Sequence, residues 1–480
     1  MATDKKYVEM TQAPLGRVIT NLAIPSIISN VVGVSYSLID AFYVGSMGAA
    51  SSAAEGVVMP VIVVIQAFGL LLGIGAGNRA SVELGKKNIK RAQQLASTAF
   101  FGSFALGIIL GALALTFQIP VVHMLGSTPV IDPLAVAYMR PLLWVAPFFC
   151  ATFVLNPALR FQGYATESML GMIAGVVLNA ILEPVFMFAM HLGVFGAGLG
   201  TAVAQVFSFV VMLVIYFKKA TAAIHFSEFT FSGSVWKEIL ATGFPSFVRN
   251  GLFAVSSDLL NVIAAAYGAA AISAMTIIGR IINLGNVIQV GIGQGYQPVC
   301  GYNYGAKKFD RVRKGYWLVL RASFILLIVV CVAEYIWAPQ LIRIFIDNKQ
   351  VIDYGTLALR VFCSDFWLNA WVVMSNMMQQ NLGHTVIASI VGLGNNCIFF
   401  IPALLILPRL FGFYGIALSQ PVSMLCTSLM NVPMQAYVLK KLRAKENAWK
   451  ADHPDGLGAP ANNEQVADVE ETMVPGGSAE

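Results

Sequence analysis

The stretch that decides the fold occurs twice, because Pro25-Ser26-Ile27-Ile28-Ser29-Asn30 is followed 220 residues later by Pro245-Ser246-Phe247-Val248-Arg249-Asn250. The same gapless offset aligns further identical residues of the two halves. It places Gly48 on Gly268, Gly73 and Gly75 on Gly293 and Gly295, Gly85 on Gly305, Arg91 on Arg311, Arg140 on Arg360 and Gly163 on Gly383. One register held over this length indicates an internal duplication.

The composition is that of a membrane protein. Of the 480 residues, 57% are hydrophobic and 11% are charged, and the mean hydropathy is +0.73. A soluble chain carries roughly a quarter charged residues. A soluble globular enzyme is therefore excluded, and the long apolar blocks predict an all-α polytopic membrane protein.

Twelve apolar segments are long enough to cross a bilayer, which takes about 20 residues of helix. They are residues 17–45, 51–82, 93–119, 134–159, 166–190, 195–218, 238–266, 270–303, 314–338, 354–381, 385–407 and 413–439. The polar connection 219–237 separates an N-lobe, 17–218, from a C-lobe, 238–445. We predict twelve transmembrane helices in two six-helix lobes. Because six spans return the chain to the side on which it started, both lobes have the same orientation in the membrane, as in a parallel repeat.

Basic residues mark one side of the membrane. They cluster at the termini and in the even-numbered connections, namely at Lys5/Lys6/Arg17, Lys86/Lys87/Lys90/Arg91, Lys218/Lys219, Lys307/Lys308/Arg311/Arg313/Lys314 and Lys440/Lys441/Arg443/Lys445. The positive-inside rule then predicts that both termini are cytoplasmic, in a multi-pass protein of the inner (cytoplasmic) membrane. We expect residues 1–16 to form a cytoplasmic N-terminus and residues 446–480 a disordered cytoplasmic tail. The basic clusters indicate orientation, and no nucleic-acid partner is expected.

Ionisable side chains inside apolar spans are costly and are therefore candidates for function. They are Asp40, Glu55 and Glu183 in the first half and Arg249, Asp258, Arg280, Glu334 and Asp365 in the second. A carboxylate such as Asp40 can bind a proton or a sodium ion, because desolvation makes its charge switchable. The alternative for Asp40 is a carboxylate that is hydrogen-bonded for packing.

Asn179 and Glu183 are four residues apart and so share one helix face. Pro184 follows and frees a backbone carbonyl near the carboxylate. Two oxygen ligands beside an opened backbone suit a small hard cation. The alternative is a kinked helix with one buried acid.

Pro25 and Pro245 occupy matching places in the first and seventh spans, where a missing hydrogen bond predicts a bend in each helix. Arg249, Asp258 and Arg280 are secondary candidates in the second half. Asp258 could pair with Arg280 across helices, so a structural network is the favoured interpretation of these charges.

Motifs for other chemistries are absent. The five histidines have no metal-ligand spacing, and the glycines from Gly73 to Gly77 lie in an apolar span without the lysine of a phosphate loop. No cofactor, no catalytic residue and no resident metal are expected. Parallel repeats of this kind are a transporter design. Because the sequence has no nucleotide motif, an ion gradient would have to drive such transport.

Several short motifs follow one another along the chain. They are Ile39-Asp40-x-x-Tyr43-Val44-Gly45, Gly85-Lys86-Lys87 with its copy Gly305-Ala306-Lys307-Lys308, Asn156-x-x-x-Arg160 with Gly163, Asn179-x-x-x-Glu183-Pro184, and Gly196-Ala197-Gly198-Leu199-Gly200-Thr201-Ala202. Over about residues 15–440 the chain resembles the multidrug and toxic compound extrusion (MATE) family, in its DinF- and MepA-like branch.

The resemblance implies two lobes around a central cavity and export of bulky, often cationic drugs in exchange for protons or sodium. It implies a cation or proton site, in the N-lobe, at Asp40, Asn179, Glu183 and Thr201, and a substrate cavity lined by Asn156, Asn30 and Tyr43. The chain has Glu183 where many relatives have Asp, and Phe253 where another branch has an acid in the seventh span. Coupling by a proton or by sodium therefore stays open.

We expect a secondary active antiporter that exports amphipathic organic cations by alternating access and acts as a monomer in the lipid bilayer. Its partners would be small-molecule drugs, and it would not be an enzyme. The alternative is a flippase for lipid-linked oligosaccharides, or a narrow metabolite exporter, of the same superfamily. An acidic N-lobe and twelve spans favour the antiporter, because such flippases often have fourteen spans and a more cationic cavity.

Overall fold

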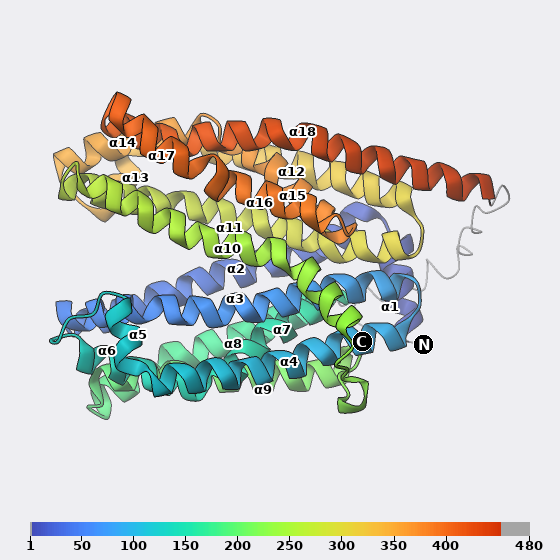
Figure 1. Ribbon diagram of the computed structural model, residues 1–480, viewed down its shortest axis with the longest axis horizontal. Coiled ribbons are helices and arrows are strands. Elements are labelled where there is room, and N and C mark those ends of the chain that lie inside the picture. The colour runs from blue at the N-terminus through green and yellow to red at the C-terminus, as the bar shows by residue number, and fades with distance from the viewer. Residues whose placement is uncertain (1, 453–480) are drawn as a thin grey trace, which may run out of the picture.

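The structure is a computed structural model that describes residues 2–452, except for the side chains of residues 2–4, Phe253, Ala254 and Asp258. Helices dominate it, and no strand occurs among the residues described. The helices run side by side in two bundles (Figure 1). This arrangement follows from the composition, because in hydrocarbon a helix satisfies its backbone polar groups within its own span.

Six spans make up the N-lobe, together with two short helices, α1 and α5, that lie outside the spans. Their bounds are α1 Ala2–Gln12, α2 Leu15–Ser46, α3 Ala49–Gly85, α4 Ile89–Thr116, α5 Gln118–Met124, the bent pair α6 Asp132–Trp144 and α7 Ala146–Phe161, α8 Ala165–Pro184 with the π-helix η1 Val185–Ala189, and α9 Gly193–Lys219.

The C-lobe repeats this order after the short 3-10 helix η2 Phe226–Glu228. Its helices are α10 Gly233–Ala265, α11 Ala269–Gly305, α12 Phe309–Ile336, α13 Ala338–Phe345, α14 Lys349–Cys363 with η3 Phe366–Leu368 and α15 Asn369–Asn381, α16 Thr385–Leu393 with η4 Gly394–Ile398 and α17 Phe400–Phe411, and α18 Phe413–Asp452.

The number of spans agrees with the duplication. Nine helices of the described chain are long and apolar enough to cross a membrane, and two bent pairs raise this number to eleven. The remaining span is α10, whose 33 residues include Arg249 and Asp258 and are less apolar as a result. The prediction of an all-α fold with twelve transmembrane helices in two repeated lobes is confirmed.

Two membrane spans of the described chain are broken. The breaks are in the fourth and tenth spans, with 58° between α6 and α7 and 43° between α14 and the segment that begins with η3. Proline at the first turn of α7 ends the helix before it. Both α2 and α10 continue as single helices through Pro25 and Pro245, and a bend at these two prolines stays a prediction.

The predicted start of the disordered tail was wrong by several residues. The last helix, α18, continues to Asp452. Glu446 is buried there and accepts hydrogen bonds from Arg313 and Lys450, each at 2.8 Å. These ion pairs stabilise the helix end beyond the apolar run. Residues 453–480, the rest of the predicted tail, lie outside the described part.

The two lobes meet at one end of the bundle. We call it the basic end, because α1, the end of α18 and the Lys-rich turns between α3 and α4 and between α11 and α12 lie there; the opposite end is the far end (Figure 1). Glycines allow backbones of the two lobes to touch, as in the pairs Gly75 with Ile239, Gly243 with Leu71, Gly291 with Ile27 and Gly295 with Ala23. The rings of Phe68 on α3 and Phe247 on α10 are in contact, with centroids 5.4 Å apart. Toward the far end α3 and α10 diverge (Figure 1).

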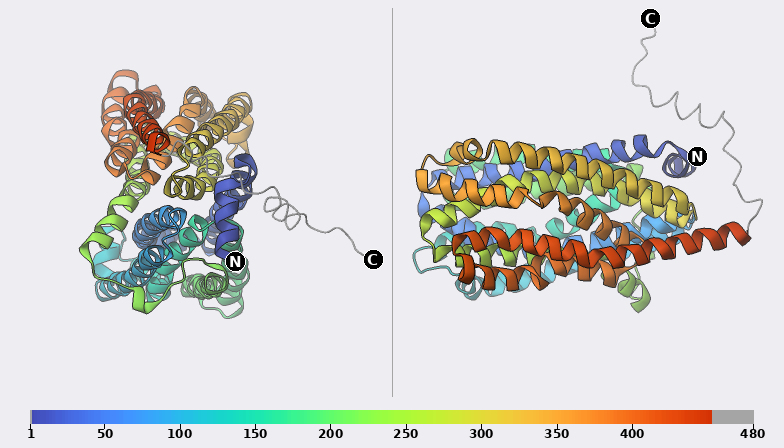
Figure 2. Two further views of the ribbon diagram at one scale, coloured as in Figure 1. Left: turned by 90° about the vertical axis from the view of Figure 1, so that its right-hand side faces the viewer. Right: turned by 90° about the horizontal axis from the view of Figure 1, so that it is seen from above.

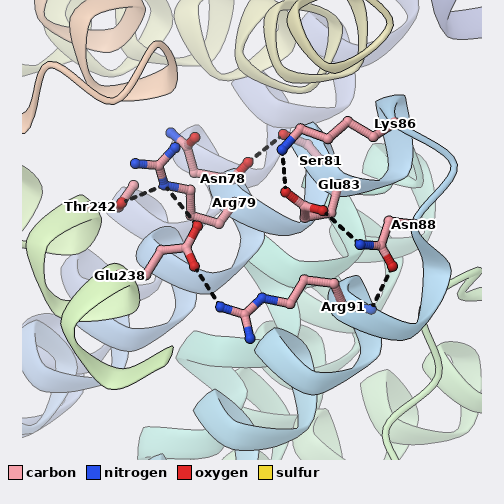
Figure 3. Close-up of polar contacts among 9 residues, drawn as sticks. All are labelled: Asn78, Arg79, Ser81, Glu83, Lys86, Asn88, Arg91, Glu238 and Thr242. Carbon is pink, nitrogen blue, oxygen red and sulfur yellow. Dashed lines mark hydrogen bonds and ion pairs between the residues drawn. The ribbon is translucent and has the colours of Figure 1, made fainter. Parts of the chain in front are cut away.

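Ion pairs join the lobes beside these glycines (Figure 3). Glu238 on α10 lies 3.0 Å from Arg91 on α4 and 3.6 Å from Arg79 on α3. The Arg79 Nε also donates to the Thr242 hydroxyl at 3.0 Å. One carboxylate of the C-lobe thus forms ion pairs with two arginines of the N-lobe.

The N-terminal helix α1 crosses from one lobe to the other at the basic end (Figure 2, left). On the C-lobe side, Asn303 donates to the Met10 carbonyl at 2.9 Å and Arg311 donates to the Ala13 carbonyl at 2.6 Å. On the N-lobe side, the Lys87 ammonium lies 4.7 Å from the centroid of the Tyr7 ring. The basic end is therefore closed by α1 as well as by the ion pairs.

Replacing Glu238→Gln should loosen the basic end, because hydrogen bonds to a charged group contribute roughly 1.5–3 kcal/mol. The separation of the lobes can be measured by double electron–electron resonance between spin labels at Lys90 and Lys314. The labelled protein would have its six native cysteines replaced. The variant should show a larger fraction of long distances. The matched control is Glu83→Gln, since Glu83 pairs with Lys86 inside the N-lobe. Equal distributions for the two variants would contradict the role given to Glu238.

Candidate functional site: a carboxylate pocket in the N-lobe

Asp40 points into the N-lobe near the far end of α2. Its side chain is 1% exposed. The Tyr138 hydroxyl on α6 donates to its Oδ2 at 2.8 Å, while its Oδ1 has no hydrogen-bond partner. Half of the carboxylate's acceptor capacity is thus unused in a buried place, where unmet hydrogen bonds are costly.

Glu183 approaches Asp40 from the last turn of α8. Its side chain is fully buried, and neither carboxylate oxygen has a hydrogen-bond partner. Asn179, one turn earlier, donates through Nδ2 to the Thr201 hydroxyl on α9 at 3.2 Å and leaves its own Oδ1 without a partner. After Pro184 the helix continues as the π-helix η1, a form often found at functional sites.

A third carboxylate, Glu55 at the start of α3, completes the pocket. It is buried, and its carboxyl group interacts with that of Asp40, as does that of Glu183. None of the ion pairs found in the described part of the chain includes any of the three. Three carboxylates buried without a basic partner have to be protonated or neutralised by a cation.

The pocket depends on close packing of α8 and α9. A Cβ added at Gly200 would lie 2.9 Å from the Glu183 Cα and 3.1 Å from its backbone nitrogen. Glycine at this position therefore brings the α9 backbone, and with it Thr201, next to the two polar residues of α8.

The oxygen atoms present can bind protons or a small cation. In residues 2–452 no set of three or more His, Cys, Asp and Glu side chains is arranged to hold a metal ion. A bound cation would use the unpartnered Asn179 Oδ1 and the Thr201 hydroxyl together with the carboxylates. Oxygen-only ligands of this kind suit hard cations.

The structure brings Asp40, Asn179, Glu183 and Thr201 together and leaves the three residues named for the substrate cavity outside the pocket. Asn156 lies near the basic end of α7, where its carbonyl accepts from Ser168. Asn30 bridges the lobes by donating to the Val287 carbonyl at 3.1 Å. Tyr43 is half-buried, with its ring edge-on to Phe42.

The charged residues predicted for the C-lobe do not form one cluster. Arg249 is half-buried and donates to Asn376, whereas Arg280 is exposed. The side chain of Asp258 lies outside the described residues, so its expected pair with Arg280 stays a prediction. Cys363 interacts with the buried Glu334 at 3.6 Å.

Asp365 is the remaining acid of the C-lobe spans. It is half-buried at the break after α14, and its Oδ2 has no hydrogen-bond partner. It lies on a different helix from Glu334 and has no contact with Arg249 among the hydrogen bonds and ion pairs described.

Sequence reasoning missed two tyrosines of the pocket. Tyr138 binds Asp40, and Tyr36 contacts the side chains of Thr201 and Gln205. Tyr36 precedes Asp40 by one helical turn, which was a usable signal. Tyr138 is 98 residues away in sequence and carried no local signal.

Replacing Gly200→Ala should destabilise the N-lobe by about 1–3 kcal/mol, the usual cost of overpacking, because the new methyl group would clash with the backbone of Glu183. The midpoint of thermal unfolding in detergent, followed by tryptophan fluorescence, measures this effect. Gly56→Ala is the matched control, since a Cβ at Gly56 meets nothing within 4 Å. Equal midpoints for the two variants would show that Gly200 is not needed for close packing.

Comparison with known proteins agrees with this architecture. The MatE family model matches residues 25–185 and again residues 245–406. The "Multidrug export protein MepA" of Staphylococcus saprophyticus is 28% identical over 405 residues, which are 83% of this chain and 88% of that protein. The protein of the same name from Staphylococcus aureus strain MRSA252 is 27% identical over 420 residues, or 86% of this chain and 92% of that protein.

Solved structures share the fold. A crystal structure of MATE in the straight conformation has a TM-score of 0.85 at 23% identity and covers 91% of this chain and 99% of its own. An outward-facing MATE family transporter of the MOP superfamily has a TM-score of 0.82 at 24% identity, with 91% and 98% covered. The two matches of the family model fall on the two lobes and together cover more than half of the chain, and the chain therefore belongs to the MATE family of membrane transporters.

Proposed function

We propose that this protein is a secondary active multidrug efflux antiporter, which exports amphipathic organic cations in exchange for protons or sodium. The observation that carries the proposal is the N-lobe pocket, where Asp40, Glu55 and Glu183 are buried together and no basic residue of the described chain pairs with them. An acidic pocket of this kind binds either a coupling ion or a cationic substrate. Exchange follows when the two compete.

The proposed orientation places the basic end in the cytoplasm of a cell with this protein in its cytoplasmic membrane. Lys86, Lys87, Lys307 and Lys308 lie in two turns at that end, and positive residues favour the cytoplasmic side. Because the lobes touch at the basic end and diverge toward the far end, the arrangement described here is outward-facing. Both termini would be cytoplasmic, and a single chain would suffice for transport.

The cycle then has two steps at the pocket. In the outward-facing form a proton or sodium ion enters from the far end and neutralises the carboxylates, which favours release of a cationic substrate. Opening of the basic end requires loss of the contacts of Glu238 and α1, and it exposes the pocket to the cytoplasm. There a new substrate cation displaces the ion.

The relatives support the drug class of the substrate. Two staphylococcal proteins that align with more than four fifths of the chain bear the name "Multidrug export protein MepA". Transport of amphipathic cations also suits a pocket in which tyrosine rings lie beside carboxylates, since cations bind both aromatic faces and acids.

The replacement Asp40→Asn should abolish efflux, because an amide at this position cannot exchange a proton or hold a cation by charge. The assay follows ethidium leaving proteoliposomes under an imposed proton gradient or an imposed sodium gradient. We expect one gradient to drive efflux by the wild type and neither to drive efflux by the variant. Asp132→Asn is the matched control, since Asp132 pairs with His123 outside the pocket and its loss should leave efflux intact.

Two results would overturn the proposal. Undiminished efflux by folded Asp40→Asn protein would remove the carboxylate pocket from the coupling mechanism. No efflux by wild-type protein under either gradient would favour a flippase or a narrow metabolite exporter. Growth rescue of a flippase-depleted strain would then identify a flippase, and failure to rescue would favour the exporter.

A further inference from the structure

The carboxylate pocket of the N-lobe and the first helix of the C-lobe carry charges of opposite sign. The pocket buries three carboxylates, whereas α10 carries the guanidinium of Arg249, which donates to the Asn376 side chain. Arg249 aligns with the neutral Ser29 of α2 in the repeat. The guanidinium is therefore a feature of the C-lobe alone, and the transport cycle proposed above does not use it.

Arg249 lies at the boundary of the lobes, where they begin to separate. Thr242, Ser246 and Arg249 are spaced for one face of α10, and Thr242 on this face accepts from Arg79 of the N-lobe. Phe247, two residues before Arg249, makes a ring contact with Phe68 of α3. Arg249 therefore lies on α10 about two helical turns from the contact of Thr242 with the N-lobe.

Two amide side chains contact Arg249, one at its guanidinium and one at its backbone carbonyl. Its Nη1 donates to Asn376 Oδ1 at 3.4 Å, and the Asn396 amide donates to the Arg249 carbonyl at the same distance. No hydrogen bond or ion pair joins Arg249 to a carboxylate within the part of the chain that the structure describes. Asp258 is nine residues further along α10, or about 13 Å of helical rise, and nine-residue spacing places the two positions on different faces of a helix.

The charge of an arginine in a membrane span is costly in free energy unless an acid, water or a ligand compensates it. One long hydrogen bond to an amide uses one of the five guanidinium N–H donors. The planar group matches a carboxylate, which it can bind through two parallel hydrogen bonds. The unmet partner at this place is therefore an anionic group.

We propose that Arg249 binds the carboxylate of an amphipathic zwitterionic substrate, whose cationic part is attracted by the N-lobe carboxylates. This inference rests on the proposed efflux function and narrows its substrate class. An acidic pocket in the N-lobe and an unpaired guanidinium in the C-lobe would then favour molecules that carry both charges over molecules that carry only a positive one. The C-lobe contributes specificity, and the N-lobe contributes coupling.

A pair of dyes tests this directly. Rhodamine 6G is a cationic ethyl ester, and hydrolysis of that ester gives a zwitterionic acid with the same ring system. Binding of each dye to full-length protein in lipid nanodiscs is measured by fluorescence anisotropy, with empty nanodiscs as the blank. Efflux of the ester from proteoliposomes is measured alongside as an independent check of transport.

The wild type should bind the acid more tightly than the ester. Arg249→Gln should weaken binding of the acid by about tenfold, which is about 1.4 kcal/mol, and change binding of the ester less than twofold. Arg249→Lys, which keeps the charge, should retain most of the preference. Arg321→Gln is the matched control, because Arg321 is an exposed arginine within α12 of the same lobe.

Equal effects of Arg249→Gln on both dyes, or no effect, would overturn the inference while efflux of the ester still supported the proposed function. Absence of ester efflux by the wild type would overturn the proposed function itself. The negative group bound at Arg249 could instead be an inorganic anion. In that case binding of the ester would depend on the chloride concentration in the wild type and not in Arg249→Gln. This result too would overturn the assignment of a substrate carboxylate to Arg249.

Discussion

The constraint on which the structure depends is the burial of three carboxylates, Asp40, Glu55 and Glu183, in an otherwise apolar lobe. A charge in such surroundings costs several kcal/mol unless it is paired, and no described basic residue pairs with these groups. The packing around them fits this constraint. Tyr138 donates to Asp40, and Gly200 lets α9 approach Glu183. Without a basic partner, the three carboxylates have to be protonated or neutralised by a bound cation.

The second requirement is that the lobes separate at one end and meet at the other. Glycine pairs such as Gly75 with Ile239 allow backbone contact at the basic end, and Glu238 and α1 add polar contacts between the lobes. Beside them lies a continuous apolar core, in which Val18 and Leu22 of α2 pack in one cluster with Tyr296 and Val299 of α11. The closed end is therefore held by apolar packing as well as by polar contacts, and opening it requires that both be lost.

Much of the fold could be predicted from the sequence, because apolar length and a gapless repeat depend on local residues. The Asn179 and Glu183 face was likewise predictable from helical spacing. The contribution of Tyr138, the lobe-bridging place of Asn30 and the position of Asn156 near the basic end were not, since they depend on contacts between distant helices. The breaks in the fourth and tenth spans were not predicted either, whereas the prolines Pro25 and Pro245 lie inside helices that remain continuous.

The central claim is that substrate and coupling ion exchange at the carboxylate pocket. The most direct measurement is the release of ions when a cationic substrate binds to purified protein, followed with a pH indicator in weakly buffered solution and with radioactive sodium in parallel. The account predicts release of protons or of sodium in proportion to the substrate bound. Binding of substrate without release of either ion would contradict it.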